Sequence, residues 1–142
     1  MRKVIFLIIL CFAACSCEHK IVDKVTPINF ENYEIQLNWE SQTVNLFAEK
    51  SFVLKSVSYY TTGNMDNAEW CDATETAPRR RECIGPWFNV TGAGELTISN
   101  ALQIKIDEND SETARFLRVH VYRYATDEII YVYQEGKPQS DN

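Results

Sequence analysis

Apolar and polar residues alternate without a break from Tyr33 to Trp39, and this pattern constrains the fold more than any other feature of the chain. Side chains of a β-strand point in turn to opposite faces, so the alternation places every apolar residue of the segment on one face. We expect that face to be buried. It carries Tyr33, Ile35, Leu37 and Trp39.

Short runs rich in β-branched and aromatic residues follow this segment, and residues that favour turns separate them. No segment keeps the i, i+3, i+4, i+7 apolar spacing of an amphipathic helix over three turns. We therefore predict an all-β fold, an immunoglobulin-like β-sandwich of about seven antiparallel strands, which these intervals match better than a closed barrel. The later strands are predicted at Thr43–Ala48, Ser51–Tyr60, Glu95–Ser99, Leu102–Ile106, Arg115–Tyr124 and Glu128–Gln134.

The size and charge of the chain narrow the possible functions. Its 142 residues, 45% of them hydrophobic, are enough for one packed domain and too few for two ordinary ones. Fourteen Lys and Arg residues against twenty Asp and Glu residues give a net charge of −6. Because binding to phosphate backbones needs a broad basic surface, we do not expect nucleic acid as a partner.

The N-terminus has the features of a secretory signal. Arg2 and Lys3 precede an apolar run of 11 residues, Val4–Ala14, which is shorter than the roughly 20 residues of a membrane-spanning helix. The segment Phe12–Cys15 resembles a bacterial lipobox, in which small residues lead into a cysteine that is lipidated and becomes the mature N-terminus. The sequence therefore predicts an exported lipoprotein.

Lipidation would attach the mature protein to a membrane. Cys15 is the expected site, Cys17 is a second and weaker candidate, and the alternative is an ordinary signal peptide with incidental cysteines. Cleavage before Cys15 leaves twelve basic and twenty acidic residues, a net charge of −8. Because the acidic chain has no basic patch to bind lipid headgroups, the lipid would hold it to the outer membrane, on the cell surface or the periplasmic face.

The predicted divisions of the chain are a signal peptide at 1–14, a lipidated tether at 15–27, a domain at 28–136 with an irregular insertion at 61–86, and a tail at 137–142.

Cys71 and Cys83 are the only cysteines inside the predicted domain. An oxidising compartment permits a disulfide between them, and closing such a loop stabilises a fold by roughly 3 kcal/mol. A zinc site is one alternative, but it needs four ligands at close spacing, and His19 and His120 are the only histidines of the chain. Two reduced and buried thiols are the other alternative.

The C-terminal half contains an ordered set of motifs: Gly85–Val90, Gly92, Gly94, Leu102–Ile106, Asn109, Arg115 and Ile130–Gly136. Their order and spacing resemble those of the BACON domain family of Bacteroidetes. The resemblance implies an immunoglobulin-like sandwich and carbohydrate or mucin binding, although other members look like plain spacers. It covers residues 87–136 well, whereas the insertion at 61–86 departs from the compact family pattern. No sugar-contacting residues can be carried over from the family.

Aromatic residues are concentrated in and beside the insertion. Flat rings stack on the apolar C–H faces of sugars, and nearby Asn and Asp side chains can bond hydroxyl groups. We therefore predict a glycan-binding platform here. The alternative is that the insertion covers one end of the sandwich and buries its tryptophan. The predicted platform residues are Tyr59, Tyr60, Trp70 and Trp87.

Signals for catalysis are weak throughout the sequence. His19 lies in the tether and His120 in an alternating strand, so neither is placed to activate a nucleophile. Asp107–Asp110 fits a solvated turn better than a calcium loop, and Arg79–Arg81 reads as a solvated basic run. We expect no enzyme, cofactor or metal. We expect a cell-envelope lipoprotein that binds glycan or mucin, with a structural spacer or a protein-interaction module as the alternative.

Overall fold

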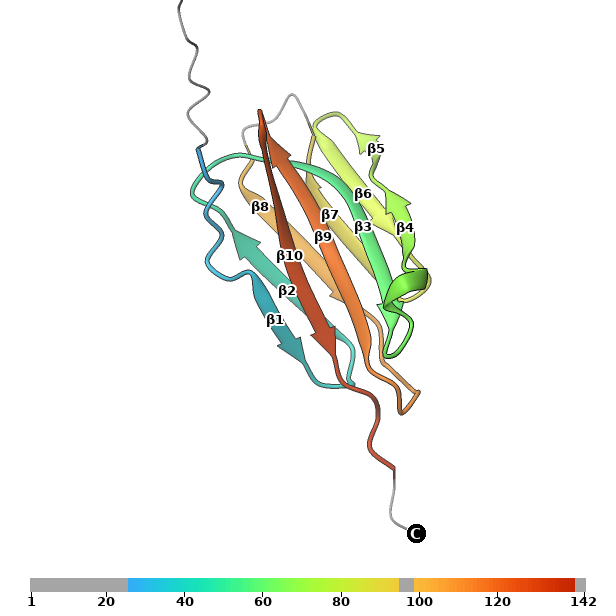
Figure 1. Cartoon of the computed structure of the whole chain (residues 1–142). Helices are drawn as coiled ribbons and strands as arrows, with labels where there is room; N and C mark the ends of the chain where they lie inside the picture. The colour runs from blue at the N-terminus through green and yellow to red at the C-terminus, as the bar shows by residue number, and fades with distance from the viewer. Residues whose placement is uncertain (1–25, 95–98, 140–142) are drawn as a thin grey trace, which may run out of the picture.

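A computed structural model describes residues 26–94 and 99–139 and contains, within those ranges, ten strands and one short 3-10 helix (Figure 1). No helix in these ranges is long and apolar enough to cross a membrane. The predicted signal peptide, the lipidation candidates Cys15 and Cys17 and most of the tether lie outside the described residues. The elements are β1 (Glu34–Leu37), β2 (Gln42–Phe47), β3 (Val53–Thr61), η1 (Met65–Asn67), β4 (Glu69–Asp72), β5 (Thr74–Ala77), β6 (Arg80–Ile84), β7 (Phe88–Ala93), β8 (Ala101–Ile106), β9 (Arg115–Arg123) and β10 (Thr126–Gln134).

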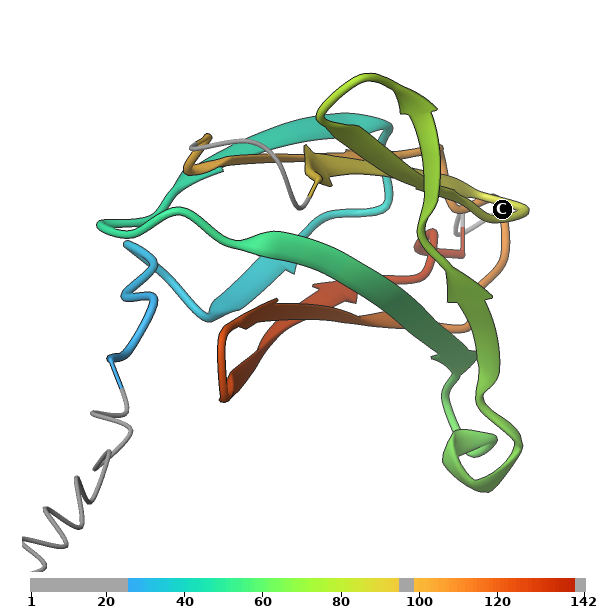
Figure 2. The same cartoon turned by 90° about the horizontal axis from the view of Figure 1, so that it is seen from above.

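The strands form two five-stranded sheets that pack as the two layers of a sandwich (Figures 1 and 2). Sheet 1 has the order β1-β10-β9-β3-β4, and sheet 2 has the order β2-β8-β7-β6-β5. Neighbouring strands are antiparallel except β1 and β10, which are parallel. The neighbours β10-β9-β3 in one layer and β2-β8 in the other correspond to the G-F-C and B-E neighbours of an immunoglobulin fold. The predicted all-β sandwich is therefore confirmed.

The hydrophobic core lies between the two sheets and is built from the inward positions of alternating strands. On β9, Leu117, Val119 and Val121 are buried, and the residues between them are partly exposed. Val90 and Ile104 of sheet 2 are fully buried in the same cluster. Each such side chain stabilises the fold by roughly 1.5–3 kcal/mol on leaving water, so the alternation read from the sequence places the core.

The segment 61–86, expected to be irregular, contains η1, β4, β5 and β6, so that expectation was wrong. β4 extends sheet 1 by pairing with β3, and β5 and β6 extend sheet 2 beside β7. Figure 2 shows the chain crossing from one layer to the other between β4 and β5. At this crossing the N–H of Ala73 donates to the Lys55 carbonyl over 3.0 Å, and the Ala73 carbonyl accepts from Arg81 over 2.7 Å. The strand count of ten, against an expected seven or so, comes largely from this segment.

β4 and β5 escaped prediction because they bury no continuous face. All four residues of β5 are exposed, and within β4 only Cys71 is partly covered. Alternating apolar and polar residues mark a strand only where one of its faces is buried. Of the strand predicted at Glu95–Ser99, residues 95–98 lie outside the described residues and Ser99 is not in a strand. The preceding strand β7 buries Phe88 and Val90 on one face and was not predicted.

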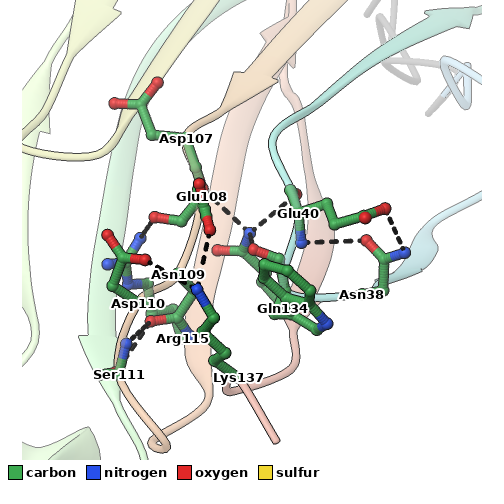
Figure 3. A network of polar contacts seen from close by, with 11 residues as sticks. Asn38, Glu40, Asp107, Glu108, Asn109, Asp110, Ser111, Arg115, Gln134 and Lys137 are labelled. Atoms are coloured by element: carbon green, nitrogen blue, oxygen red, sulfur yellow. Dashed lines mark hydrogen bonds and ion pairs between the residues drawn. The ribbon is translucent and has the colours of Figure 1, made fainter.

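A buried glutamine ties together the end of the sandwich at which β10 stops (Figure 3). Gln134 is 1% exposed, and its Nε2 donates to the backbone carbonyls of Trp39, Glu40 and Asp107 over 3.3, 3.3 and 3.0 Å. Those carbonyls belong to the β1–β2 turn and the β8–β9 loop. One side chain therefore joins three segments that are far apart in the sequence.

Asn109 is fully buried and organises the β8–β9 loop from within. Its Nδ2 donates to the carbonyls of Thr113 and Glu135, each over 2.9 Å. Its Oδ1 accepts from the N–H of Ser111 over 3.3 Å and from the Ser111 hydroxyl over 2.8 Å. All the hydrogen-bonding capacity of the amide is thus used inside the loop and at the end of β10.

The chain beyond Gly136 contacts this loop through Lys137, which the sequence assigned to the tail. Its ammonium group pairs with Glu108 over 3.2 Å and with Asp110 over 3.4 Å. The same nitrogen lies 4.7 Å from the centre of the Trp39 ring. These contacts place Lys137 beside the acidic part of the loop (Figure 3).

Candidate functional site

β3 carries two of the predicted platform residues, and they lie on opposite faces of the strand. Tyr59 faces sheet 2, where its ring centre is 5.1 Å from that of Phe88 and 6.2 Å from that of Trp87, in edge-to-face arrangements. Its hydroxyl donates to Glu69 over 2.6 Å. This hydrogen bond first, and burial second, raises the pKa of Tyr59 to about 12. Tyr59 therefore belongs to the packing at one end of the core.

Trp87 lies in the same cluster, just before β7. The guanidinium carbon of Arg115 is 5.1 Å from the centre of the indole. The same guanidinium donates to the Glu108 carbonyl over 3.3 Å, and burial lowers the pKa of Arg115 while Asp107 acts in the opposite direction. Trp87 is thus partly buried between Phe88 and an arginine, and it does not share a surface with an open binding platform.

Tyr60 lies on the outer face of sheet 1. Its register partner on β9 is Phe116, whose partner on β10 is Tyr133. The rings of Tyr60 and Phe116 are stacked, with centres 4.9 Å apart and 6° between their planes. The rings of Phe116 and Tyr133 have centres 5.2 Å apart. Three neighbouring strands therefore align three rings across the outside of the sheet.

Trp70 reaches the same outer face from β4, the edge strand of sheet 1, and is 61% exposed. It pairs in register with Ser58, and its ring centre lies 4.9 Å from that of His120. The alternative in which the insertion buries Trp70 is therefore wrong. β4 joins the sheet at its edge, where no further strand of the described chain covers the indole.

Tyr131 completes this surface from β10 and is 48% exposed. Between the rings lies a depression of about 290 Å³ that is also lined by Glu34 and Gln36 of β1. Its walls come from four neighbouring strands of sheet 1. We call the following five residues the aromatic face: Tyr60, Trp70, Phe116, Tyr131 and Tyr133.

Sequence reasoning found two residues of the aromatic face and missed the other three. Phe116, Tyr131 and Tyr133 stand at outward positions of β9 and β10, next to residues that are buried. The signal that could have found them was an aromatic residue at an outward-facing position of a strand in which apolar and polar residues alternate. That signal does not show which aromatic residues meet, because strand order and register depend on pairing between distant residues.

Arg118 occupies the middle of the aromatic face. Its register partners are Ser58 on β3 and Tyr131 on β10. Its guanidinium carbon lies 5.1 Å from the centre of the Tyr60 ring, and Nη2 is 3.5 Å from the Tyr60 hydroxyl. Its Nε is covered and has no hydrogen-bond partner within the described chain. No carboxylate of the described residues lies within ion-pair distance of this guanidinium.

A serine and a histidine meet on this face, with Ser58 Oγ 3.2 Å from His120 Nε2. Ser58 is fully buried, so a substrate cannot reach its oxygen. Burial lowers the pKa of His120, and the positive charges of Lys55 and Arg118 lower it further. A neutral His120 ring therefore acts here as a support on which Trp70 packs.

Cys71 and Cys83, the predicted disulfide partners, are neighbouring free thiols in this structure. Cys71 lies on β4 of sheet 1 and Cys83 on β6 of sheet 2, and the Cys83 thiol donates to the Cys71 carbonyl over 3.3 Å. Burial first, and the nearby Cys71 thiol second, raises the pKa of Cys83 to about 12. The fold brings the two residues together, and the bond itself stays a prediction. In the ranges that the structure describes, no three His, Cys, Asp or Glu residues gather to hold a metal.

The basic run Arg79–Arg81 does not form a continuous basic surface. Arg79 sits at the turn between β5 and β6 with a φ of 72°. Arg80 pairs with Glu82 over 2.6 Å, and Arg81 donates to a backbone carbonyl at the sheet crossing. Two of the three guanidinium groups are therefore engaged within the fold.

Comparison with known proteins bears on the fold. No protein-family model and no curated protein matches the chain. A solved structure described as an NMR structure of a protein from Bacteroides thetaiotaomicron is similar, with a TM-score of 0.54 and 20% sequence identity, over 80% of this chain and 84% of that chain. At that identity the similarity shows a shared fold alone, and the β-sandwich itself is shown by the two sheets of this chain.

Proposed function

We propose that this protein is a carbohydrate-binding domain without catalytic activity and that a glycan lies across the aromatic face. Trp70 is the observation that carries the proposal, because a 61% exposed indole stands on the same surface as the stacked rings of Tyr60 and Phe116. Rigid aromatic side chains offer a large apolar area at a low cost in conformational entropy. The C–H faces of a sugar ring match such a surface.

The polar groups around the rings support the same function. The phenol groups of Tyr131 and Tyr133 and the side chains of Glu34 and Gln36 lie around one depression. Binding sites for small ligands combine an apolar surface with a few polar groups that fix the orientation of the ligand. Sugar hydroxyl groups would find hydrogen-bond partners at the rim while the ring face stacks in the middle.

The cellular setting that we propose rests on the sequence. The signal-like N-terminus and the lipobox resemblance around Cys15 support a lipoprotein anchored in the outer membrane of a bacterium. The BACON resemblance supports glycans or mucin as ligands in that setting. A lipid anchor would hold the domain at the envelope, with the aromatic face free to bind material in the medium.

A glycan array probed with the purified protein tests the proposal. We expect Trp70→Ala to weaken the strongest glycan interaction about tenfold or more, as loss of a central aromatic anchor does. Because the side chain is exposed, the free energy of unfolding should change by only about 0.5 kcal/mol. Phe47→Ala is the matched control, since Phe47 is an exposed aromatic residue on sheet 2.

Two outcomes would contradict glycan binding. In one, folded wild-type protein binds no glycan on an array that contains mucin glycans and plant and host polysaccharides. In the other, Trp70→Ala binds as well as Phe47→Ala.

A protein-interaction module is the second candidate, because exposed Trp and Tyr side chains are also enriched at protein interfaces. If no glycan on the array binds and the aromatic face binds no protein either, a structural spacer is favoured.

A further inference from the structure

The charge at the centre of the aromatic face is uncompensated. Arg118 is surrounded by rings and hydroxyl groups, and within residues 26–94 and 99–139 it forms no ion pair. Three other cations of these ranges do form ion pairs, Lys55 with Asp127, Arg80 with Glu82 and Lys137 with Glu108. Arg118 is partly covered and stands against an aromatic ring, and no acidic side chain of the described residues lies close enough to pair with it, although the chain as a whole has a net charge of −6.

The hydrogen bonds of Arg118 are also incomplete. Its one hydrogen bond to a described residue is long, 3.5 Å to the Tyr60 hydroxyl, and its Nε is covered without a partner. A guanidinium presents five N–H donors in a planar fork that matches the two oxygens of a carboxylate. A ligand cannot reach the covered Nε, so it is the Nη groups of the partly exposed side chain that offer an anion a positive charge and hydrogen-bond donors.

We infer that the aromatic face recognises an acidic glycan and that Arg118 binds the carboxylate of a uronic or sialic acid unit. The sugar ring then stacks on the neighbouring aromatic side chains while the carboxylate meets the guanidinium. This inference rests on the proposed function and names its ligand class. Glu34 lies across Tyr131 from Arg118 and repels an anion, which favours placing the acidic unit on the side of Arg118 nearer to Trp70.

The test compares acidic glycans with neutral versions that differ by one group. Uronate oligosaccharides and sialylated oligosaccharides are arrayed beside their carboxyl-reduced counterparts and probed with the full chain. We expect at least one acidic member to bind about tenfold or more tightly than its reduced counterpart, as the loss of a hydrogen bond to a charged group predicts. This preference should disappear in Arg118→Gln and be largely lost in Arg118→Lys, which keeps the charge without the planar fork.

Lys105→Gln is the matched control, because Lys105 is exposed on sheet 2 and its loss changes the net charge equally. Thermal unfolding confirms that each variant is folded. Equal binding of acidic and reduced glycans, or a preference that survives in Arg118→Gln, overturns the inference. If neutral glycans bind in a Trp70-dependent manner without an acidic preference, the proposed function stands and the inference fails. If no glycan binds, both fail.

Discussion

Replacing Asn109 by alanine should destabilise the domain more than any exposed substitution. The change removes four hydrogen bonds of a fully buried side chain, two donated to carbonyls and two accepted from Ser111. At a net value of about 1 kcal/mol for each bond, the upper bound is about 4 kcal/mol. The carbonyls of Thr113 and Glu135 belong to exposed residues and can regain water, which lowers the expected loss to about 2–3 kcal/mol.

Urea denaturation followed by tryptophan fluorescence measures this loss. We expect a lower midpoint with an unchanged slope, and a fall in Tm of about 10 °C, since about 1 kcal/mol corresponds to roughly 4 °C in a domain of this size. Ser111→Ala removes only the hydroxyl bonds over 2.8 and 3.1 Å and should cost about 1 kcal/mol. Glu112→Ala, at an exposed position in the same loop, should be neutral within about 0.5 kcal/mol. A stability of Asn109→Ala equal to that of Glu112→Ala would refute the reasoning.

Oxidation with glutathione disulfide should join Cys71 to Cys83 and raise the free energy of unfolding by about 3 kcal/mol. Mass spectrometry of the linked peptides and urea denaturation check this, with Cys71→Ser as the control, and two thiols that stay free under oxidant would exclude the pairing. His120 predicts a pH dependence. Its folded pKa is below the unfolded value of about 6.5, so the unfolded chain takes up the proton first and stability falls as pH drops through this window. His120→Gln should therefore lose less stability than the wild type between about pH 7.5 and pH 5, and an identical loss in both proteins would contradict the assignment.

Much of the sandwich could be predicted because its central strands alternate between core and solvent. In β1, Ile35 and Leu37 are buried and their neighbours exposed, as the pattern at Tyr33–Trp39 indicated. β4 and β5 have no buried face, so their sequence gives no such signal. The parallel pairing of β1 with β10 could not be predicted from the local sequence either, because it joins Ile35 to Val132, near the other end of the domain.

Two adjacent residues of the candidate site show the same contrast between what the local sequence predicts and what it does not. Tyr59 and Tyr60 were equal candidates in the sequence, yet one packs on Phe88 in the core and the other stacks on Phe116 outside. The sequence by itself determined that strands would form and that neighbouring residues would face opposite ways, because alternation is a local property of an extended chain. Only the tertiary structure decided which outward side chains meet around Arg118, because sheet order and register depend on pairing between residues distant in the chain.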